Sequence, residues 1–187
     1  MNVYLRDVEA SDLALFFEHQ RDPIAVEMVM FRSRDKAEFA QHWAKLLADH
    51  SCLKKTIIVA SAVSAENDVS PAAPAENDVA SAVSAENGVG SAVSAEDQVV
   101  GHIGSWTSEG KREIGYWLDR AFWGRGIATK AISDFLLLEP TRPLYASVAK
   151  HNAASVRVLQ KCRFVIDGAS SEDDGATHIL LKLAAQM

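Results

Sequence analysis

The stretch from Glu113 to Phe135 constrains the fold of this chain most, because it joins a strand pattern to a helix pattern through two glycines. Residues 113–118 suit a strand, since they contain aromatic and β-branched residues and are followed by a polar pair. From Ile127 onward the apolar residues recur at helical spacing, which predicts a helix over 127–138. Gly124-Arg125-Gly126 lies between them and permits a close approach to the backbone, because glycine has no Cβ.

A glycine loop that leads into a helix is a ready site for an anion. The first helical turn has N–H groups without backbone partners, and the helix dipole adds partial positive charge there. The spacing Gly124-x-Gly126 also fits a plain turn that binds nothing. Thr129 replaces the third glycine of a dinucleotide fingerprint, and the Gly-Lys-Ser/Thr ending of a P-loop is missing. The glycines therefore indicate a phosphate site only together with the residues around them.

Those surrounding residues carry a family resemblance. The run Trp123-Gly124-Arg125-Gly126-Ile127-Ala128-Thr129 resembles the acetyl-CoA pyrophosphate motif of the GNAT acetyltransferase superfamily, whose general form is Gln/Arg-x-x-Gly-x-Gly/Ala. Gly126 and Ala128 match the last two positions, and Trp123 occupies the first. Tryptophan at that position resembles the branch related to ribosomal-protein-alanine N-acetyltransferases.

A second run, residues 152–164, is similar to the GNAT pattern Asn-x-x-Ser/Ala followed by Lys-x-Gly-Phe. The matching residues are Asn152, Ser155, Lys161 and Phe164. Arg163 stands where the family has glycine, the usual left-handed helix cap, so the end of this helix is left open. Leu159 stands where many members carry a tyrosine that protonates the departing thiolate. That general acid is missing unless water or another side chain serves.

The resemblance covers roughly residues 3–60 and 97–183 and implies the GNAT fold, which is α/β (α+β). We therefore expect a mixed, mostly antiparallel central sheet, with helices on both faces and one parallel strand pair around the glycine loop. The implied reaction moves acetyl from acetyl-CoA to a primary amine of a protein N-terminus or small molecule by direct attack. The expected cofactor-binding residues are Leu118, Trp123, Gly124, Arg125, Gly126, Ile127, Ala128, Thr129, Lys130, Asn152 and Ser155.

The resemblance also implies roles for these residues. Backbone amides from Arg125 through Lys130 would hold the pyrophosphate, and a backbone N–H near Leu118 would stabilise the oxyanion. Asn152 and Ser155 would touch the pantetheine arm or the sulfur, and we count both as catalytic candidates.

Glu113 is the candidate base, acting directly or through water, because an ammonium must lose a proton before it attacks. An exposed glutamate on an edge strand is an equally good interpretation. His102 could face the same cleft, although a single histidine on a strand is more often structural. A non-catalytic CoA-binding sensor or interaction module is the alternative function, because position 159 is not tyrosine and the chain carries an unusual insertion.

The remaining elements follow from local patterns. Strands are expected over 3–7, 56–59, 99–106, 144–148, 164–167 and 178–183. Ser11 or Asp12 is expected to cap one helix and Asp35 a second one, with Glu38 completing a capping box. The apolar stretch 24–31 is ambiguous between a short helix and a loop. Strand, helix and strand over 113–148 predict a right-handed crossover and therefore a parallel strand pair.

The insertion consists of a ten-residue unit repeated four times over residues 61–100, without any aromatic residue. Such a composition buries too little apolar surface to offset its ordering entropy. We expect a single domain over 1–187, in which 61–96 is a disordered or weakly ordered hairpin-loop insertion; short extra strands are the alternative. Residues 61–100 hold seven acids and no Lys or Arg, so without them the net charge changes from −6 to about +1.

Composition narrows the class of protein. Apolar residues make up 48% and charged residues 24%, which is typical of soluble globular proteins, and no apolar run has the length of a membrane helix. The N-terminus resembles no signal peptide, and Cys52 and Cys162 indicate neither a disulfide framework nor a metal cluster. A net charge of −6 disfavours nucleic-acid binding. We expect a cytoplasmic protein without a metal, and leave the acceptor and the oligomeric state open.

Overall fold

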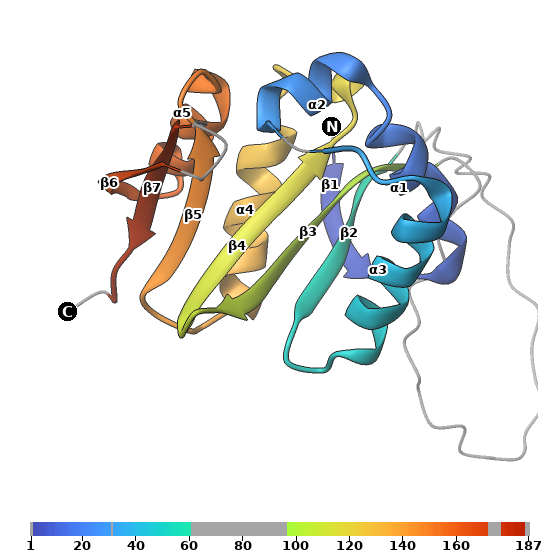
Figure 1. The fold of residues 1–187 in the computed structure, drawn as a ribbon, viewed down its shortest axis with the longest axis horizontal. Coiled ribbons are helices and arrows are strands. Elements are labelled where there is room, and N and C mark those ends of the chain that lie inside the picture. Colours follow the sequence, from blue (N-terminus) through green and yellow to red (C-terminus); the bar gives the residue numbers. More distant parts are fainter. Residues whose placement is uncertain (1, 31, 61–96, 172–176, 186–187) are drawn as a thin grey trace, which may run out of the picture.

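A seven-stranded mixed sheet forms the centre of the computed structural model, which describes residues 2–30, 32–60, 97–171 and 177–185 (Figure 1). The strand order is β1-β2-β3-β4-β5-β7-β6, and every neighbouring pair is antiparallel except β4 and β5. The strands are β1 Asn2–Asp7, β2 Leu53–Ala60, β3 Gln98–Ser108, β4 Lys111–Leu118, β5 Leu144–Ala149, β6 Val165–Ser171 and β7 Thr177–Leu183. The expected mixed sheet with one parallel pair is therefore confirmed.

Helices cover both faces of this sheet, as expected. They are α1 Leu13–His19, α2 Pro23–Val29, α3 Lys36–Ala48, α4 Ile127–Leu138 and α5 Ala153–Lys161, with short 3₁₀ helices η1 Ala10–Asp12 and η2 Arg120–Phe122. Side chains alternate between the two faces along a strand, and β3 shows both. His102 contacts the rings of Phe16 in α1 and Trp43 in α3. The next residue, Ile103, packs in the core cluster that contains α4.

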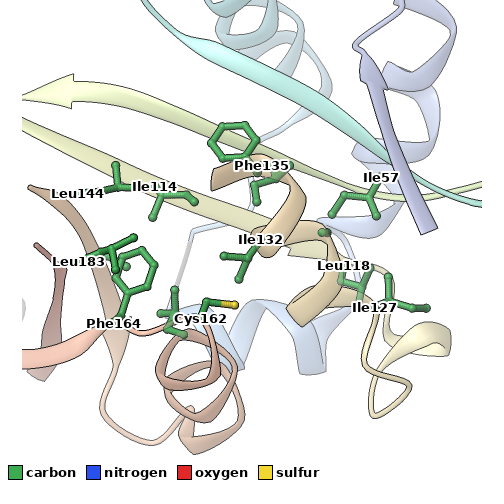
Figure 2. Close-up of a cluster of buried hydrophobic side chains, with 14 of the residues drawn as sticks. Ile57, Ile114, Leu118, Ile127, Ile132, Phe135, Leu144, Cys162, Phe164 and Leu183 are labelled. Carbon is green, nitrogen blue, oxygen red and sulfur yellow. The ribbon is translucent and has the colours of Figure 1, made fainter. Parts of the chain in front are cut away.

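The main core lies between the sheet and helix α4. α4 buries Ile127, Ala131, Ile132 and Phe135, which are spaced so that they share one helical face. Figure 2 shows Ile132 among Ile114 and Leu118 of β4 and Cys162, which directly follows α5. Burying one such side chain stabilises the fold by about 1.5–3 kcal/mol. This packing holds the first turn of α4, and with it the end of the glycine loop, against the sheet.

The capping box predicted for α3 is confirmed. The Asp35 carboxylate accepts hydrogen bonds from the N–H groups of Ala37 and Glu38 at 2.8 and 2.9 Å. The Glu38 side chain in turn accepts a hydrogen bond from the Asp35 N–H at 3.3 Å. Each side chain therefore pairs N–H groups that the first helical turn leaves without a backbone partner.

Asp12 occupies the N-cap position of α1, one of the two positions predicted, but its side chain forms no capping hydrogen bond with that helix. Asp12 is buried, and its carboxylate forms an ion pair with Arg6 of β1 and accepts a hydrogen bond from Thr56 of β2. Burial raises the pKa of Asp12, but hydrogen bonds from Arg6 and Thr56 outweigh that effect and lower it. The carboxylate therefore joins α1 to the sheet through contacts that local sequence does not reveal.

The ambiguous stretch 24–31 contains helix α2. The Asp22 carboxylate caps it by accepting hydrogen bonds from Ile24 N–H at 2.9 Å and Ala25 N–H at 3.2 Å. Pro23 occupies the first turn, where its missing N–H has no cost. The helix ends at Met30, which adopts a left-handed conformation with a φ of 51°. Asp22-Pro23 therefore begins a helix in the stretch that the sequence left ambiguous.

Helix α5 ends in a left-handed turn although the family glycine is absent. Arg163 takes a φ of 69°, the conformation that glycine adopts most readily. The Arg163 N–H donates to Gln160 O at 3.0 Å, and the Phe164 N–H donates to Leu159 O at 3.1 Å. These two bonds are the pattern of a Schellman cap. The helix thus ends where the family pattern would end it, with a strained residue in the glycine position.

A buried ionic cluster closes α4. Glu139 follows that helix, is 3% exposed, and binds Ser105 of β3 and Arg112 of β4. Burial raises the pKa of Glu139, but hydrogen bonds from Ser105, Thr141 and Arg112 lower it to about 2. The carboxylate stays ionised and fastens the end of α4 to the sheet.

The decapeptide stretch 61–96 lies outside the described residues, so neither its predicted disorder nor the alternative of short strands is tested. β2 and β3, which precede and follow it, are hydrogen-bonded neighbours, and Val59 lies opposite Gln98. The expected closing pair is confirmed as β6 and β7, which are antiparallel. None of the helices within the described ranges has the length and apolar character needed to cross a membrane.

Candidate active site

The parallel strands β4 and β5 pair at only two positions and then separate. Arg112 lies opposite Leu144 and Glu113 opposite Tyr145, and the two strands have no further pairing among the described residues. Figure 1 shows β4 and β5 diverging from this point toward the end of the sheet that carries α2 and α5. Among the described residues, the part of β4 beyond this pairing has no neighbouring strand on the β5 side. Its backbone N–H and C=O groups there need another partner, which a bound ligand can supply.

A cavity of about 310 Å³ lies where the strands separate. Its walls come from α2, the end of β4, the glycine loop with the start of α4, and α5. The lining residues are Ala25, Met28, Val29, Tyr116, Trp117, Leu118, Phe122, Trp123, Gly124, Gly126, Ile127, Ala128, Thr129, Asn152, Ala154, Ser155, Arg157, Val158 and Lys161. Both sequence motifs therefore meet in one cavity, although they are far apart along the chain.

The glycine loop forms one wall of this cavity, and both glycines have left-handed backbone conformations. The φ angles are 73° at Gly124 and 78° at Gly126, which side chains other than glycine rarely adopt. A Cβ built on either glycine would meet no atom within 4 Å, so the surface above the loop is open. Gly126 begins α4, which has no side-chain cap. Its first-turn N–H groups therefore suit a bound anion.

Three residues around the loop use their side chains for structural contacts. The Trp123 indole N–H donates to Leu118 O at 2.9 Å, which fixes the loop against the end of β4. Arg125 lies over the ring of Phe122 at 5.4 Å, and Lys130 pairs with Asp134 one turn along α4. Arg125 and Lys130 do not line the cavity, so only their backbone amides remain as candidates for binding a pyrophosphate.

Glu113 lies apart from the other predicted site residues. It does not line the cavity and sits where β4 and β5 are still paired, opposite Tyr145. It is half-buried, and burial raises its pKa while Lys111 opposes the rise. Strand alternation places Glu113 on the same face as Trp117, four residues along β4 and about 13 Å away. A direct contact with reacting atoms is therefore less suitable for Glu113 than action through water.

His102 belongs to the aromatic packing of α1 and α3. Its ring lies 4.7 Å from that of Phe16 and 5.1 Å from that of Trp43, and it does not line the cavity. Burial, and to a lesser extent the nearby His19 and His42, lower its pKa to about 3. A neutral ring in an aromatic cluster fits the structural interpretation of His102.

Several lining residues escaped prediction from the sequence. Arg157 and Lys161 line the cavity from α5, and their spacing of four residues, which places both on one helical face, was the available signal. With the phenol of Tyr116, they are the ionisable side chains among the described lining residues, so the cavity favours anions. The α2 residues Ala25, Met28 and Val29 carried no such signal, because they reach the cavity only through tertiary packing.

A hydrogen bond crosses from β4 to α5 inside the cavity. The Tyr116 hydroxyl donates to Ser155 Oγ at 3.0 Å. Asn152 caps α5 by accepting the Ser155 N–H with its side-chain oxygen at 3.0 Å. Burial raises the pKa of Tyr116, which outweighs the lowering effect of Ser155. Asn152, Ser155 and a protonated phenol thus form a connected polar group in a mostly apolar cavity.

Comparison with known proteins agrees with this geometry. The family model described as acetyltransferase (GNAT) domain matches residues 2–165. A search of curated proteins found no match to the chain.

Solved structures share the fold at low sequence identity. A spermidine N-acetyltransferase from Vibrio cholerae, in complex with CoA and spermine, has a TM-score of 0.69 and 13% identity, over 97% of this chain and 95% of that one. A GNAT-family acetyltransferase from Bacillus anthracis has a TM-score of 0.68 and 13% identity, over 98% and 95%. An aminoglycoside acetyltransferase in complex with coenzyme A has a TM-score of 0.63 and 17% identity, over 97% and 95%.

Proposed function

We propose that this chain, which belongs to the GNAT acetyltransferase family, moves the acetyl group of acetyl-CoA to a primary amine by direct attack. The observation that carries the proposal is the meeting of the glycine loop, Asn152 and Ser155 in one cavity at the separation of β4 and β5. Direct attack requires the amine and the thioester to be held together, which removes much of the entropic cost of the reaction.

The glycine loop is the proposed pyrophosphate site. The uncapped first turn of α4 supplies N–H donors and the positive end of the helix dipole. The open surface above Gly124 and Gly126 admits an anion close to the backbone. Arg157 and Lys161 add positive charge on the α5 side, which suits the phosphates of coenzyme A.

The chemical step needs a base, and we propose Glu113 acting through water. Its raised pKa makes it a stronger base than an ordinary glutamate, although it lies outside the cavity lining. A backbone N–H near Leu118, at the end of β4, is the proposed donor to the oxyanion. Ser155 and Asn152 are proposed to lie at the pantetheine arm or sulfur.

The proposed acceptor is the amine of a protein N-terminus or of a small molecule. Trp123 in the loop motif favours the ribosomal-protein-alanine N-acetyltransferase-like branch. The names of structural neighbours point instead to small amines, namely spermidine, aminoglycosides and phosphinothricin. Acceptor-dependent release of coenzyme A thiol distinguishes them, measured with N-terminal alanine peptides, spermidine, an aminoglycoside and free amino acids against a reaction without acceptor.

A non-catalytic CoA-binding module is the second candidate function. It is favoured by Leu159, which is 2% exposed in the core and supplies no general acid. Calorimetric binding of acetyl-CoA without thiol release from any acceptor in that panel would support this alternative. Release with any one of the acceptors would support the enzyme.

A further inference from the structure

The proposed transfer leaves coenzyme A as a thiolate, which needs a proton when the C–S bond breaks. Position 159 of α5 cannot provide one, because Leu159 packs in the core and does not line the cavity. The proton must come from a different group near the first turn of α5, or from water.

The hydrogen bond between Tyr116 and Ser155 has the polarity that a proton relay needs. The phenol is the donor and Ser155 Oγ is the acceptor, at 3.0 Å. The Ser155 hydroxyl proton is therefore directed toward some other acceptor. Both side chains line the cavity, and Asn152 fixes the backbone of Ser155 through its N–H. The serine hydroxyl is thus held at the entry of α5 with its proton available to a ligand.

The other proton-bearing groups in the cavity are placed less well for this step. Lys161 lies six residues beyond Ser155 along α5, which is about 9 Å of helix. Arg157 holds its proton too tightly to act as an acid. Cys162 lies beside the same helix but is buried, with its thiol directed at Thr129 O.

We propose that Tyr116 serves as the proton source behind Ser155 in the departure of coenzyme A, an inference that rests on the acetyl transfer proposed above. The amine nitrogen bonds to the thioester carbon, and its surplus proton passes to the base. The C–S bond then breaks, Ser155 gives its hydroxyl proton to the sulfur, and Tyr116 gives its phenol proton to Ser155 Oγ. Solvent returns a proton to the phenolate. Tyr116 is a positioning residue, since it acts through Ser155.

The kinetic test uses Tyr116→Phe, with Tyr145→Phe as the matched control. Tyr145 lies on neighbouring β5, and its ring contacts Lys111 and Lys182. Tyr116→Phe should lower kcat about 100-fold, the lower end of the range for general acid catalysis, with little change in KM for acetyl-CoA. The deficit should shrink above about pH 9, because thiols with pKa values near 8.5 then leave without a proton. A deficit that stays constant at every pH indicates only a structural role and overturns the proposal.

Three more variants separate the relay from packing. Ser155→Ala should lose as much activity as Tyr116→Phe, and the double variant should lose no more than either. Ser155→Thr keeps a hydroxyl and should restore most of the rate. Additive losses would show that the two hydroxyls act separately and would contradict the relay.

A binding measurement keeps the proposal testable even if no acceptor is turned over. Coenzyme A bound to the protein is titrated through its thiolate absorbance, in the wild type and in Tyr116→Phe. A hydroxyl that donates to the sulfur stabilises the thiolate and lowers the pKa of the bound thiol. Tyr116→Phe removes the proton source behind that hydroxyl, so the pKa of the bound thiol should be higher in the variant than in the wild type. Equal pKa values in the two proteins would overturn the relay. Absent turnover with unequal values would refute only the proposed acetyl transfer.

Discussion

Asp22 binds Arg120 with one carboxylate oxygen and caps helix α2 with the other. The Arg120 Nε lies 2.7 Å from Asp22 Oδ2, while Oδ1 accepts the N–H groups of Ile24 and Ala25. α2 supplies one wall of the cavity, and Arg120 belongs to η2, just before the glycine loop. One carboxylate therefore holds together two walls of the site.

Replacing Asp22 should loosen this wall, and two variants separate its roles. Asp22→Asn keeps a good N-cap but loses the ion pair, whereas Asp22→Ala loses both. We expect Asp22→Ala to lower Tm and raise KM for the acceptor. Asp22→Asn should be close to wild type, because exposed ion pairs contribute little. Thermal unfolding and steady-state kinetics check this, and equal losses in both variants would assign the effect to the ion pair.

Charge introduced at the glycine loop should weaken cofactor binding. Gly126→Asp and Gly126→Asn place side chains of similar size at the same left-handed position, which both residues tolerate better than most. Only the aspartate repels a pyrophosphate. The Gly126→Asp variant should therefore bind acetyl-CoA about 10- to 100-fold more weakly than the Gly126→Asn variant, since each 1.4 kcal/mol of repulsion raises Kd tenfold. Calorimetry on folded variants measures this ratio. Equal affinities would place the pyrophosphate elsewhere.

Glu113→Gln should lower turnover more than acetyl-CoA affinity, because a base acts on the barrier and not on cofactor binding. The active form of a base is the carboxylate. Burial raises the pKa of Glu113, so activity should decline as pH falls through that raised pKa. In Glu113→Gln this acid limb should disappear from the kcat/KM profile. Near-full turnover across the pH series would assign the role to another group or to bulk water.

Arg163→Gly should stabilise the fold. The left-handed conformation of Arg163 costs about 1–2 kcal/mol of stability. Glycine avoids this cost, but it loses more conformational entropy on folding, which offsets part of the gain. The expected net gain is about 1 kcal/mol, or about 2–4 °C in Tm. Arg163→Ala is the control, since alanine removes the charge and keeps the strain. If alanine raised Tm as much as glycine, the gain would come from the lost charge.

The decapeptide repeats should be dispensable for fold and chemistry. Deleting residues 61–90 leaves the unit 91–100 to join β2 and β3, whose residues Val59 and Gln98 are opposite partners. Shortening the connection from about forty to about ten residues should lower the free-energy cost of closing the loop by roughly 1 kcal/mol. Tm should be at least that of the parent, with similar acetyl-CoA affinity. A much lower Tm, or lost acceptor selectivity with acetyl-CoA still bound, would show that the acidic repeats contribute to the acceptor site.

Local sequence patterns alone predicted several elements of this fold. Two glycines before an apolar helical pattern predicted the loop and α4, and Asp35 with Glu38 predicted the start of α3, because both depend on residues within one turn. The family resemblance of the two motifs, and not a local pattern, placed Asn152 and Ser155 beside the glycine loop, where the cavity brings them together.

Only the tertiary structure decided the contacts between distant residues. Asp12 has the sequence pattern of a cap, yet its carboxylate binds Arg6 and the buried Thr56. In the sequence, Tyr116 is an ordinary strand residue. In the structure β4 separates from β5, and the Tyr116 hydroxyl donates a hydrogen bond to Ser155 on α5. Local propensity depends on neighbours along the chain, whereas these bonds depend on how strands and helices pack. The two partners are 39 residues apart for Tyr116–Ser155 and 44 for Asp12–Thr56, beyond the reach of any local pattern.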